Sequence, residues 1–352
     1  MKKMINKSTV TSFINYGIVI ALFAVFQTLS ATGNLSRQLT GLLIPICAYV
    51  IMALALNLVV GISGELSLGH AGFMSVGAFS GVITAAALQN SVTNDVARFV
   101  IAVVVAALIA AIAGLIIGIP VLRLRGDYLA IVTLAFGEII KNVLTCLYIG
   151  VDSKGLHISA VSEEALGLEA TGKAIVKGPM GAVGIMKIST FISGIILVLI
   201  ALFVIQNLIN SRTGRAIKAI RDNRIAAEAC GLNVVKYKLI AFVTSAAIAG
   251  SAGALYAMNY SSITPKKFDF NTSILVLVFV VLGGIGNLTG SIIAAIVLVA
   301  LPELLREFSD YRMLVYAVVL ILVMIISNNQ KTRAFIGKIF GVFKKKKEGE
   351  DN

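Results

Sequence analysis

The stretch Ile101-Ala-Val-Val-Val-Ala-Ala-Leu-Ile-Ala-Ala-Ile-Ala-Gly-Leu-Ile-Ile-Gly-Ile119 contains neither a charged nor a polar side chain. The stretch Phe191–Ile209 is equally free of charge. As a helix, about 20 such residues cover the roughly 30 Å of hydrocarbon in a bilayer. A strand would leave its backbone groups unpaired in lipid, so helices rather than strands are predicted to cross the membrane.

The composition of the whole chain also indicates a membrane protein. Of its 352 residues, 58% are hydrophobic and 13% are charged, whereas soluble domains have about 25% charged residues. The net charge of +13 would suggest nucleic acid in a soluble protein, but here the basic residues lie between apolar runs and at the chain ends. We therefore predict contact with lipid, no nucleic-acid partner, and retention of the basic segments on one membrane face.

Apolar runs separated by polar breaks predict an all-α polytopic membrane protein with about ten transmembrane helices, and with eight as the lower estimate. The predicted spans cover 13–29, 39–59, 68–89, 98–118, 128–148, 189–209, 238–258, 270–286, 289–304 and 312–327. Four glycines interrupt the stretch from 270 to 304, so its pair of helices is expected to be short, broken or re-entrant. The run Phe13–Leu29 also fits a signal peptide, but the charge distribution favours a span.

The positions of Lys and Arg predict the orientation. With the amino terminus inside, nineteen of these residues lie on the cytoplasmic side and ten lie outside, as expected for cytoplasmic loops enriched in positive charge. Both termini are then cytoplasmic. The chain divides into a transmembrane domain at 1–330 and a basic cytoplasmic tail at 331–352, with a cytoplasmic loop at 210–237 and an outer loop at 150–187.

Two ionisable residues, Glu138 and Lys141, lie inside a predicted span. Three residues apart on a helix, they share one face and can form an ion pair. A charge inside a membrane is by default a candidate for function, but a purely structural pair, or Lys141 reaching toward a wet cavity, is an equal alternative. Small residues spaced by four, such as Gly77 and Gly81, predict close helix packing, either static or at a moving gate.

Signals for catalysis are weak. The segment Gly167–Ala174 approaches a phosphate-binding loop, but Ala174 replaces the Ser or Thr that would bind magnesium. The two histidines, His70 and His157, lie in different segments, and the three cysteines are widely spaced, so neither a metal site nor a disulfide framework is indicated. We expect no enzyme activity, no metal and no cofactor bound by the chain itself.

The segment from Ser211 to Asn233 reads as a helical hairpin between two spans. Ser211 or Thr213 can cap its first helix, Asp222 or Asn223 can cap a second, and Gly231 can end it in the left-handed conformation. A basic amphipathic connector of this kind is either a solvated loop or a docking surface. Its alternating Ala and Ile residues favour docking.

Several sequence blocks resemble the permease subunits of bacterial ABC importers for branched-chain amino acids, specifically the larger of their two permease types. The blocks that carry this resemblance occur in the family's order along most of the chain. They are Leu56–Gly61 with Gly64–Phe73, Leu122–Glu138, Gly214–Arg221 with Ala226–Gly231, Val281–Gly286, and Leu301–Arg306.

The resemblance implies a multi-pass permease in a bacterial plasma membrane that pairs with a second permease. It also implies two cytoplasmic ATPase subunits, which bind the ATP, and an extracytoplasmic substrate-binding protein. A short cytoplasmic helix of such permeases docks into the ATPase, and its nearest match here lies at Arg221–Gly231. The resemblance therefore assigns ATPase coupling to Arg221, Asp222, Glu228 and Gly231, although Cys230 replaces a family alanine.

The expected function is import of leucine, isoleucine or valine along a path between this chain and its partner. Candidates for lining that path are the polar residues of the spans, namely Asn57, Ser67, Thr133 and Glu138. A related importer for urea or short amides is an alternative. An ion-coupled secondary transporter, with Glu138 as the coupling carboxylate, is a less favoured one, and a membrane-embedded enzyme has no supporting residues. The outer loop 150–187 is longer than the family's connector and is expected to be a lid, a docking surface or an insertion.

Overall fold

A computed structural model describes residues 16–17, 19–21, 24–28, 37–89, 91–123, 127–152, 155–168 and 172–305, together with positions 314, 317–318 and 321. The chain forms two compact units, Met1–Ile296 and Val297–Asn352. The first unit contains nearly all of the described residues. The predicted tail 331–352 and most of the predicted span 312–327 lie outside the described residues.

Six helices of the described part are long and apolar enough to cross a membrane. They are α2 (Arg37–Asn57, continued by the π-helix η1, Leu58–Ser63), α3 (His70–Ala87), α4 (Asp95–Val121), α5 (Asp127–Cys146), α6 (Phe191–Asn210) and α9 (Val234–Ala257). Each lies within a few residues of a predicted span. Shorter apolar helices are found within the predicted spans that begin at 13, 270 and 289. The predicted polytopic helical class is confirmed.

The interruption predicted between 270 and 304 separates two short helices, α10 (Phe270–Gly283) and α11 (Leu288–Leu304). Gly284 and Gly286 in the turn have φ values of 92° and 82°, a conformation that glycine adopts without steric cost. Helix α10 has 14 residues and is therefore only about 21 Å long. Helix α10 is therefore too short to cross the full hydrocarbon thickness of about 30 Å.

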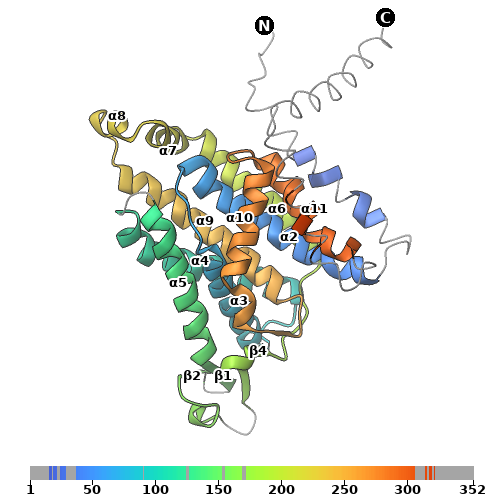
Figure 1. The fold of residues 1–352 in the computed structure, drawn as a ribbon. Helices are drawn as coiled ribbons and strands as arrows, with labels where there is room; N and C mark the ends of the chain where they lie inside the picture. Colours follow the sequence, from blue (N-terminus) through green and yellow to red (C-terminus); the bar gives the residue numbers. More distant parts are fainter. Residues whose placement is uncertain are drawn as a thin grey trace, which may run out of the picture. The chain divides into compact units, whose positions relative to one another are not determined.

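Helix α9 is the centre of the bundle and packs against α2, α3 and α4 (Figure 1). Small residues let the backbones approach closely, as their spacing predicts. A methyl group added at Gly253 would overlap the Met74 carbonyl of α3, and one at Gly77 would overlap the Gly250 backbone. Neither glycine can therefore be replaced without moving α9.

A five-stranded antiparallel sheet lies at one end of the bundle (Figure 1). Its order is β2-β1-β3-β4-β5, from β1 (Tyr148–Asp152), β2 (Gly155–Ser159), β3 (Lys173–Lys177), β4 (Ala182–Val183) and β5 (Ser262–Ile263). Short 3₁₀ turns connect it, namely η2 (Glu164–Leu166), η3 (Gly178–Met180) and η4 (Pro265–Phe268). Four of these strands, β1 to β4, lie in or at the start of the predicted outer loop 150–187. The sequence does not reveal these strands, because each is at most five residues long. In addition, β4 pairs with β5, and α9 lies between these two strands in the sequence.

Two short helices, α7 (Arg212–Asp222) and α8 (Arg224–Ala229), form a hairpin between α6 and α9. This hairpin lies at the opposite end of the bundle from the sheet (Figure 1). Three neighbouring elements, α6, α9 and η1, contact α7 of the hairpin.

Candidate functional site

Local hydrogen bonds form the predicted hairpin. Ser211 Oγ accepts from the Gly214 backbone N–H at 3.1 Å, and Asn223 Oδ1 accepts from the Ala226 N–H at 3.0 Å. Such caps satisfy the free amides at the start of a helix. Gly231 follows α8 with φ = 79°, as predicted for a left-handed helix end. Both short helices are therefore specified by their own sequence.

A small apolar core fixes the hairpin to the bundle. Ile220, Ala227 and Val234 are buried together, with Leu232 and Tyr237 packed against them. The pairing of α7, α8 and the start of α9 explains how helices this short remain folded, since helices of this length are marginal in isolation. The hairpin is a defined surface and not a solvated loop.

The exposed surface of α8 combines a large apolar side chain, Ile225, with the charged pair of Arg224 and Glu228. Ile225 is 80% exposed, and Arg224 Nε donates to Glu228 Oε1 at 2.8 Å. Asp222, Glu228 and Gly231, three of the four predicted coupling residues, are also exposed. The fourth, Arg221, is also exposed, but its guanidinium donates hydrogen bonds to the Gly61 carbonyl and to Asp222.

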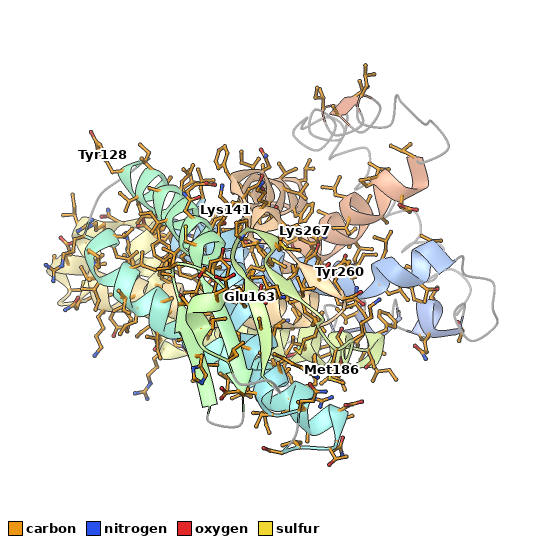
Figure 2. All side chains as sticks on the ribbon, turned by 90° about the horizontal axis from the view of Figure 1, so that it is seen from below. Tyr128, Lys141, Glu163, Met186, Tyr260 and Lys267 are labelled. Atoms are coloured by element: carbon orange, nitrogen blue, oxygen red, sulfur yellow. The ribbon has the colours of Figure 1, made fainter. Side chains whose placement is uncertain are left out.

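Glu138 of α5 lies where a second helix begins. Its Oε1 accepts from the Phe270 backbone N–H at 3.3 Å, and its Oε2 forms an ion pair with Lys141. A carboxylate at a helix N-terminus is stabilised by the helix dipole and by the free amides there. The Glu138 and Lys141 side chains are 33% and 21% exposed, so the predicted pair is partly open to the surroundings. Nearby, Lys267 lies over the Tyr260 ring, 4.7 Å from its centroid (Figure 2).

The other predicted path residues, Asn57, Ser67 and Thr133, are buried and connect backbone segments. Asn57 Nδ2 donates to Ser291 Oγ at 2.8 Å, and its Oδ1 accepts from the Gly286 N–H at 2.9 Å. Thr133 Oγ1 accepts from the Leu68 N–H at 3.1 Å and donates to a carbonyl of its own helix. The four candidates thus do not form one cluster, and only Glu138 is accessible from outside the chain.

A chain of hydrogen bonds centred on His70 includes one predicted path residue, Ser67, but its other side chains, His70 and Ser245, are not among the predicted site residues. Ser245 Oγ donates to the Ala55 carbonyl at 2.6 Å, so it accepts from His70 Nε2 at 2.7 Å. The neutral imidazole then accepts at Nδ1 from Ser67 Oγ, at 3.1 Å. Burial without a charged partner favours this neutral form. These hydrogen bonds connect α3, α9 and α2. The one sign of them in the sequence is a single histidine inside a predicted span.

The family model described as "Branched-chain amino acid transport system / permease component" matches residues 38–326. The chain belongs to this family. Every predicted site residue lies inside the matched region.

Individual relatives agree with this family. The high-affinity branched-chain amino acid transport system permease protein LivM of Escherichia coli K12 is 40% identical over 291 residues, which cover 79% of this chain. LivM of Salmonella typhimurium is 39% identical over the same length. LivH of Salmonella typhimurium, another permease protein of that system, is 31% identical over 118 residues, or 33% of this chain and 38% of LivH. No solved structure matches the chain.

The chain spans 66% of the length of each LivM protein. Family membership, together with the apolar helices, shows that this is a multi-pass membrane protein of the branched-chain amino acid transport permease family.

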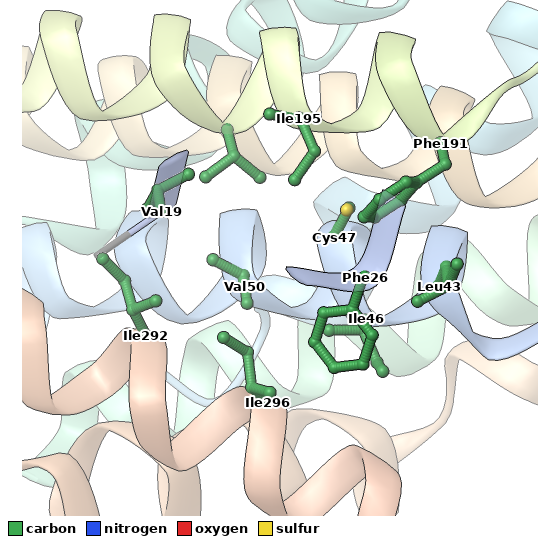
Figure 3. Close-up of a pocket in the computed structure, with 11 residues that line it drawn as sticks. Val19, Phe26, Leu43, Ile46, Cys47, Val50, Phe191, Ile195, Ile292 and Ile296 are labelled. Atoms are coloured by element: carbon green, nitrogen blue, oxygen red, sulfur yellow. The ribbon is translucent and has the colours of Figure 1, made fainter. Parts of the chain in front are cut away.

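Two hollows of the described structure differ in chemistry. One, of about 430 Å³ including space open to the surroundings, is lined by apolar side chains and Cys47 from α2, α6, α11 and the helix near residue 19 (Figure 3). The other, of about 1660 Å³ measured in the same way, lies between the sheet and the end of α3. Its wall includes an ion pair between Lys177 and Glu163 at 2.7 Å. Only the second offers both charges that a zwitterion requires.

Proposed function

We propose that the chain is a permease subunit of an ATP-driven importer for the branched-chain amino acids leucine, isoleucine and valine. Membership in the family and the transport function of both LivM relatives support this proposal. The partners would be a second permease of the LivH kind, two ATPase subunits and an extracytoplasmic binding protein. In this proposal the chain itself contains no ATPase site and holds no cofactor, because ATP is bound by the ATPase subunits.

The observation that carries the coupling part of the proposal is the exposed face of α8. Ile225 projects from a hairpin that is capped, packed and joined directly to α6 and α9. An exposed apolar knob beside charged groups suits a groove in a partner protein, with charge providing specificity more than affinity. We assign this face to the ATPase, so the hairpin would be cytoplasmic. From the distribution of Lys and Arg we propose that both termini are cytoplasmic as well.

The translocation path is proposed to follow the exposed side of α5. Glu138 and Lys141 present a carboxylate and an ammonium at partial exposure, the two charges that complement a zwitterionic amino acid. Thr133, Ser67 and Asn57 then support the path by fixing the segments around it. The second permease would close the path from the other side.

Purification of the tagged permease in mild detergent, after expression with its partner subunits, tests the docking face. We expect the ATPases to co-purify with wild type and to be lost with Ile225→Asp, because a charge replaces the apolar knob. The matched control is Val161→Asp at the opposite end, since Val161 is 82% exposed and has no role in the proposal. Retention of the ATPases by Ile225→Asp, or their loss with both variants, would contradict the assignment.

Uptake into vesicles tests the energy source and the substrate. Proteoliposomes that contain the complete complex are expected to accumulate leucine only with internal ATP, and to ignore a proton or sodium ionophore. Uptake that collapses with the ionophore and ignores ATP would support the ion-coupled alternative instead. Uptake of urea or acetamide in preference to leucine would point to the related amide importers.

A further inference from the structure

The span formed by α2 ends in an unusual way next to the hairpin. Its last residues, Leu58–Ser63, form a π-helix, and Gly64 ends it with φ = 75°. A π-helical turn is rare and often occurs at functional sites because it leaves the backbone less regularly bonded. We call the segment 57–65, from Asn57 to Glu65, the π-segment.

Arg221 of the hairpin binds the π-segment directly. Its Nη1 donates to the Gly61 carbonyl at 2.9 Å, while Nε and Nη2 both donate to Asp222 Oδ1, at 3.0 and 2.9 Å. The side chain is 37% exposed, yet each of the three guanidinium nitrogens already has a partner within the chain. A Cβ at Gly64 would lie 2.7 Å from Arg221 Cγ, so the stem of the arginine packs on the π-segment as well.

The π-segment is connected in turn to the α10–α11 turn. A methyl group at Gly61 would overlap both Asn57 Oδ1 and the Gly286 backbone. Asn57 bonds to the Gly286 N–H and to Ser291 on the far side of that turn. All of these groups are buried or partly buried, so the contacts are not easily replaced by water.

A second connection holds the other end of the π-segment. Glu65 forms an ion pair with Lys238 near the start of α9, and both side chains are largely buried. The π-segment is therefore joined to the hairpin, to α9 and to the α10–α11 turn at three different residues.

We propose that Arg221 is a positioning residue that transmits the movement of the hairpin to the π-segment and the α10–α11 turn, and not a residue of the ATPase-docking face. Short, directional contacts between packed elements let them shift as one body. The inference rests on the proposed function, because it requires an ATPase that moves the hairpin. It divides the hairpin into an outer face, around Ile225, that docks, and an inner residue, Arg221, that couples.

The test compares Arg221→Gln and Arg221→Lys in proteoliposomes that contain the complete complex. The readouts are co-purification of the ATPases, basal ATP hydrolysis, stimulation of hydrolysis by leucine-loaded binding protein, and leucine uptake. For Arg221→Gln we expect intact complexes and basal hydrolysis within about 2-fold of wild type, but a loss of stimulation and uptake of about 10-fold or more. Arg221→Lys is expected to recover less than about half, because one ammonium cannot reproduce the guanidinium fork.

Lys236→Gln is the matched control, because it removes one exposed positive charge from the same end of the bundle. It should keep stimulation and uptake within about 2-fold of wild type. Loss of the ATPases with Arg221→Gln would make Arg221 a docking residue and overturn the inference. Unchanged uptake, or full recovery by Arg221→Lys, would overturn it too. Failure of wild-type complexes to couple ATP to leucine uptake would instead overturn the proposed function.

Discussion

Helices α9 and α5 are both long enough to cross a bilayer, but they occupy opposite environments. In the most apolar part of α9, 72% of the residues are buried inside the chain, compared with 22% in α5. Small residues bring the α9 backbone into contact with α3 and α4, whereas α5 has Glu138, Lys141 and Asn142 on partly or fully exposed positions. Hydropathy alone does not distinguish the buried centre of the bundle from its exposed side.

A second comparison shows why the exposed side of α5 is not simply a lipid surface. Helix α4 is also widely exposed, but the side chains that project from it are aliphatic, including Val104, Leu108, Ile112 and Ile116. Such a face suits lipid chains. Charged groups on α5 are costly against lipid and are normally found facing protein or a wet cavity. The difference supports a partner subunit on α5 and lipid on α4.

The largest expected effect comes from breaking the packing of α9. In Gly253→Ala the new methyl group would overlap the Met74 carbonyl and lie 2.8 Å from the Ala78 nitrogen. Because backbone atoms on both sides cannot yield, we expect destabilisation of about 3 kcal/mol or more, seen as aggregation or a much lower melting temperature in detergent.

Gly41→Ala in α2 is the control for this substitution, since nothing lies within 4 Å of a Cβ at that position. It should leave the melting temperature unchanged or raise it, because alanine favours a helix by up to about 1 kcal/mol over glycine. Equal melting of both variants would contradict the fixed role of α9.

The next effect concerns the charge pair of α5. Glu138→Gln leaves Lys141 without its ion-pair partner and weakens the contact with the start of α10. Because an ionisable group inside a membrane is normally tied to function, we expect a loss of amino acid uptake of about 10-fold or more. The protein should still fold, because both side chains are partly exposed.

The exchange of both residues, Glu138→Lys with Lys141→Glu, separates a structural pair from a functional carboxylate. It restores an ion pair but removes the carboxylate from the amino end of α10. We expect uptake to remain low. Full recovery of uptake by the double variant would show that the pair is structural, and would weaken the contrast between α5 and α9.

The contrast also explains which features could be predicted from the sequence. Spans and caps depend on neighbouring residues, so the carboxyl end of α9 and the caps Ser211 and Asn223 could be inferred from local pattern, whereas α9 begins four residues before its predicted span. The sheet could not, because β5 at Ser262–Ile263 pairs with β4 at Ala182–Val183, on the other side of four helices in the chain. The hydrogen bond from Arg221 to the Gly61 carbonyl could not be predicted from the sequence for the same reason, since the two residues are 160 positions apart.

A smaller effect is expected from the polar chain around His70. Ser245→Ala removes the group that accepts from His70 Nε2 and that bonds the Ala55 carbonyl. Hydrogen bonds between membrane helices contribute about 1 kcal/mol, so the melting temperature should fall by a few degrees. Ser251→Ala, a buried position on the same helix whose hydroxyl bonds only its own helix at Ile248, should change it less. An equal fall in the melting temperatures of Ser245→Ala and Ser251→Ala would show that the hydrogen bonds around His70 add no particular stability.

The smallest effect is predicted for Thr145→Ala on α5, which removes a hydroxyl that donates to the Lys141 carbonyl of its own helix at 2.8 Å. That carbonyl lies in the helix ladder already and the site is only partly buried. We therefore expect a change in stability within about 0.5 kcal/mol, and uptake close to wild type. The loss of one hydroxyl is thus expected to cost more at Ser245 than at Thr145, because the Ser245 hydroxyl connects separate helices and the Thr145 hydroxyl bonds its own helix. A fall in melting temperature as large as that of Ser245→Ala would mean that α5 is fixed within this chain, and would leave no reason to assign its exposed side to a partner.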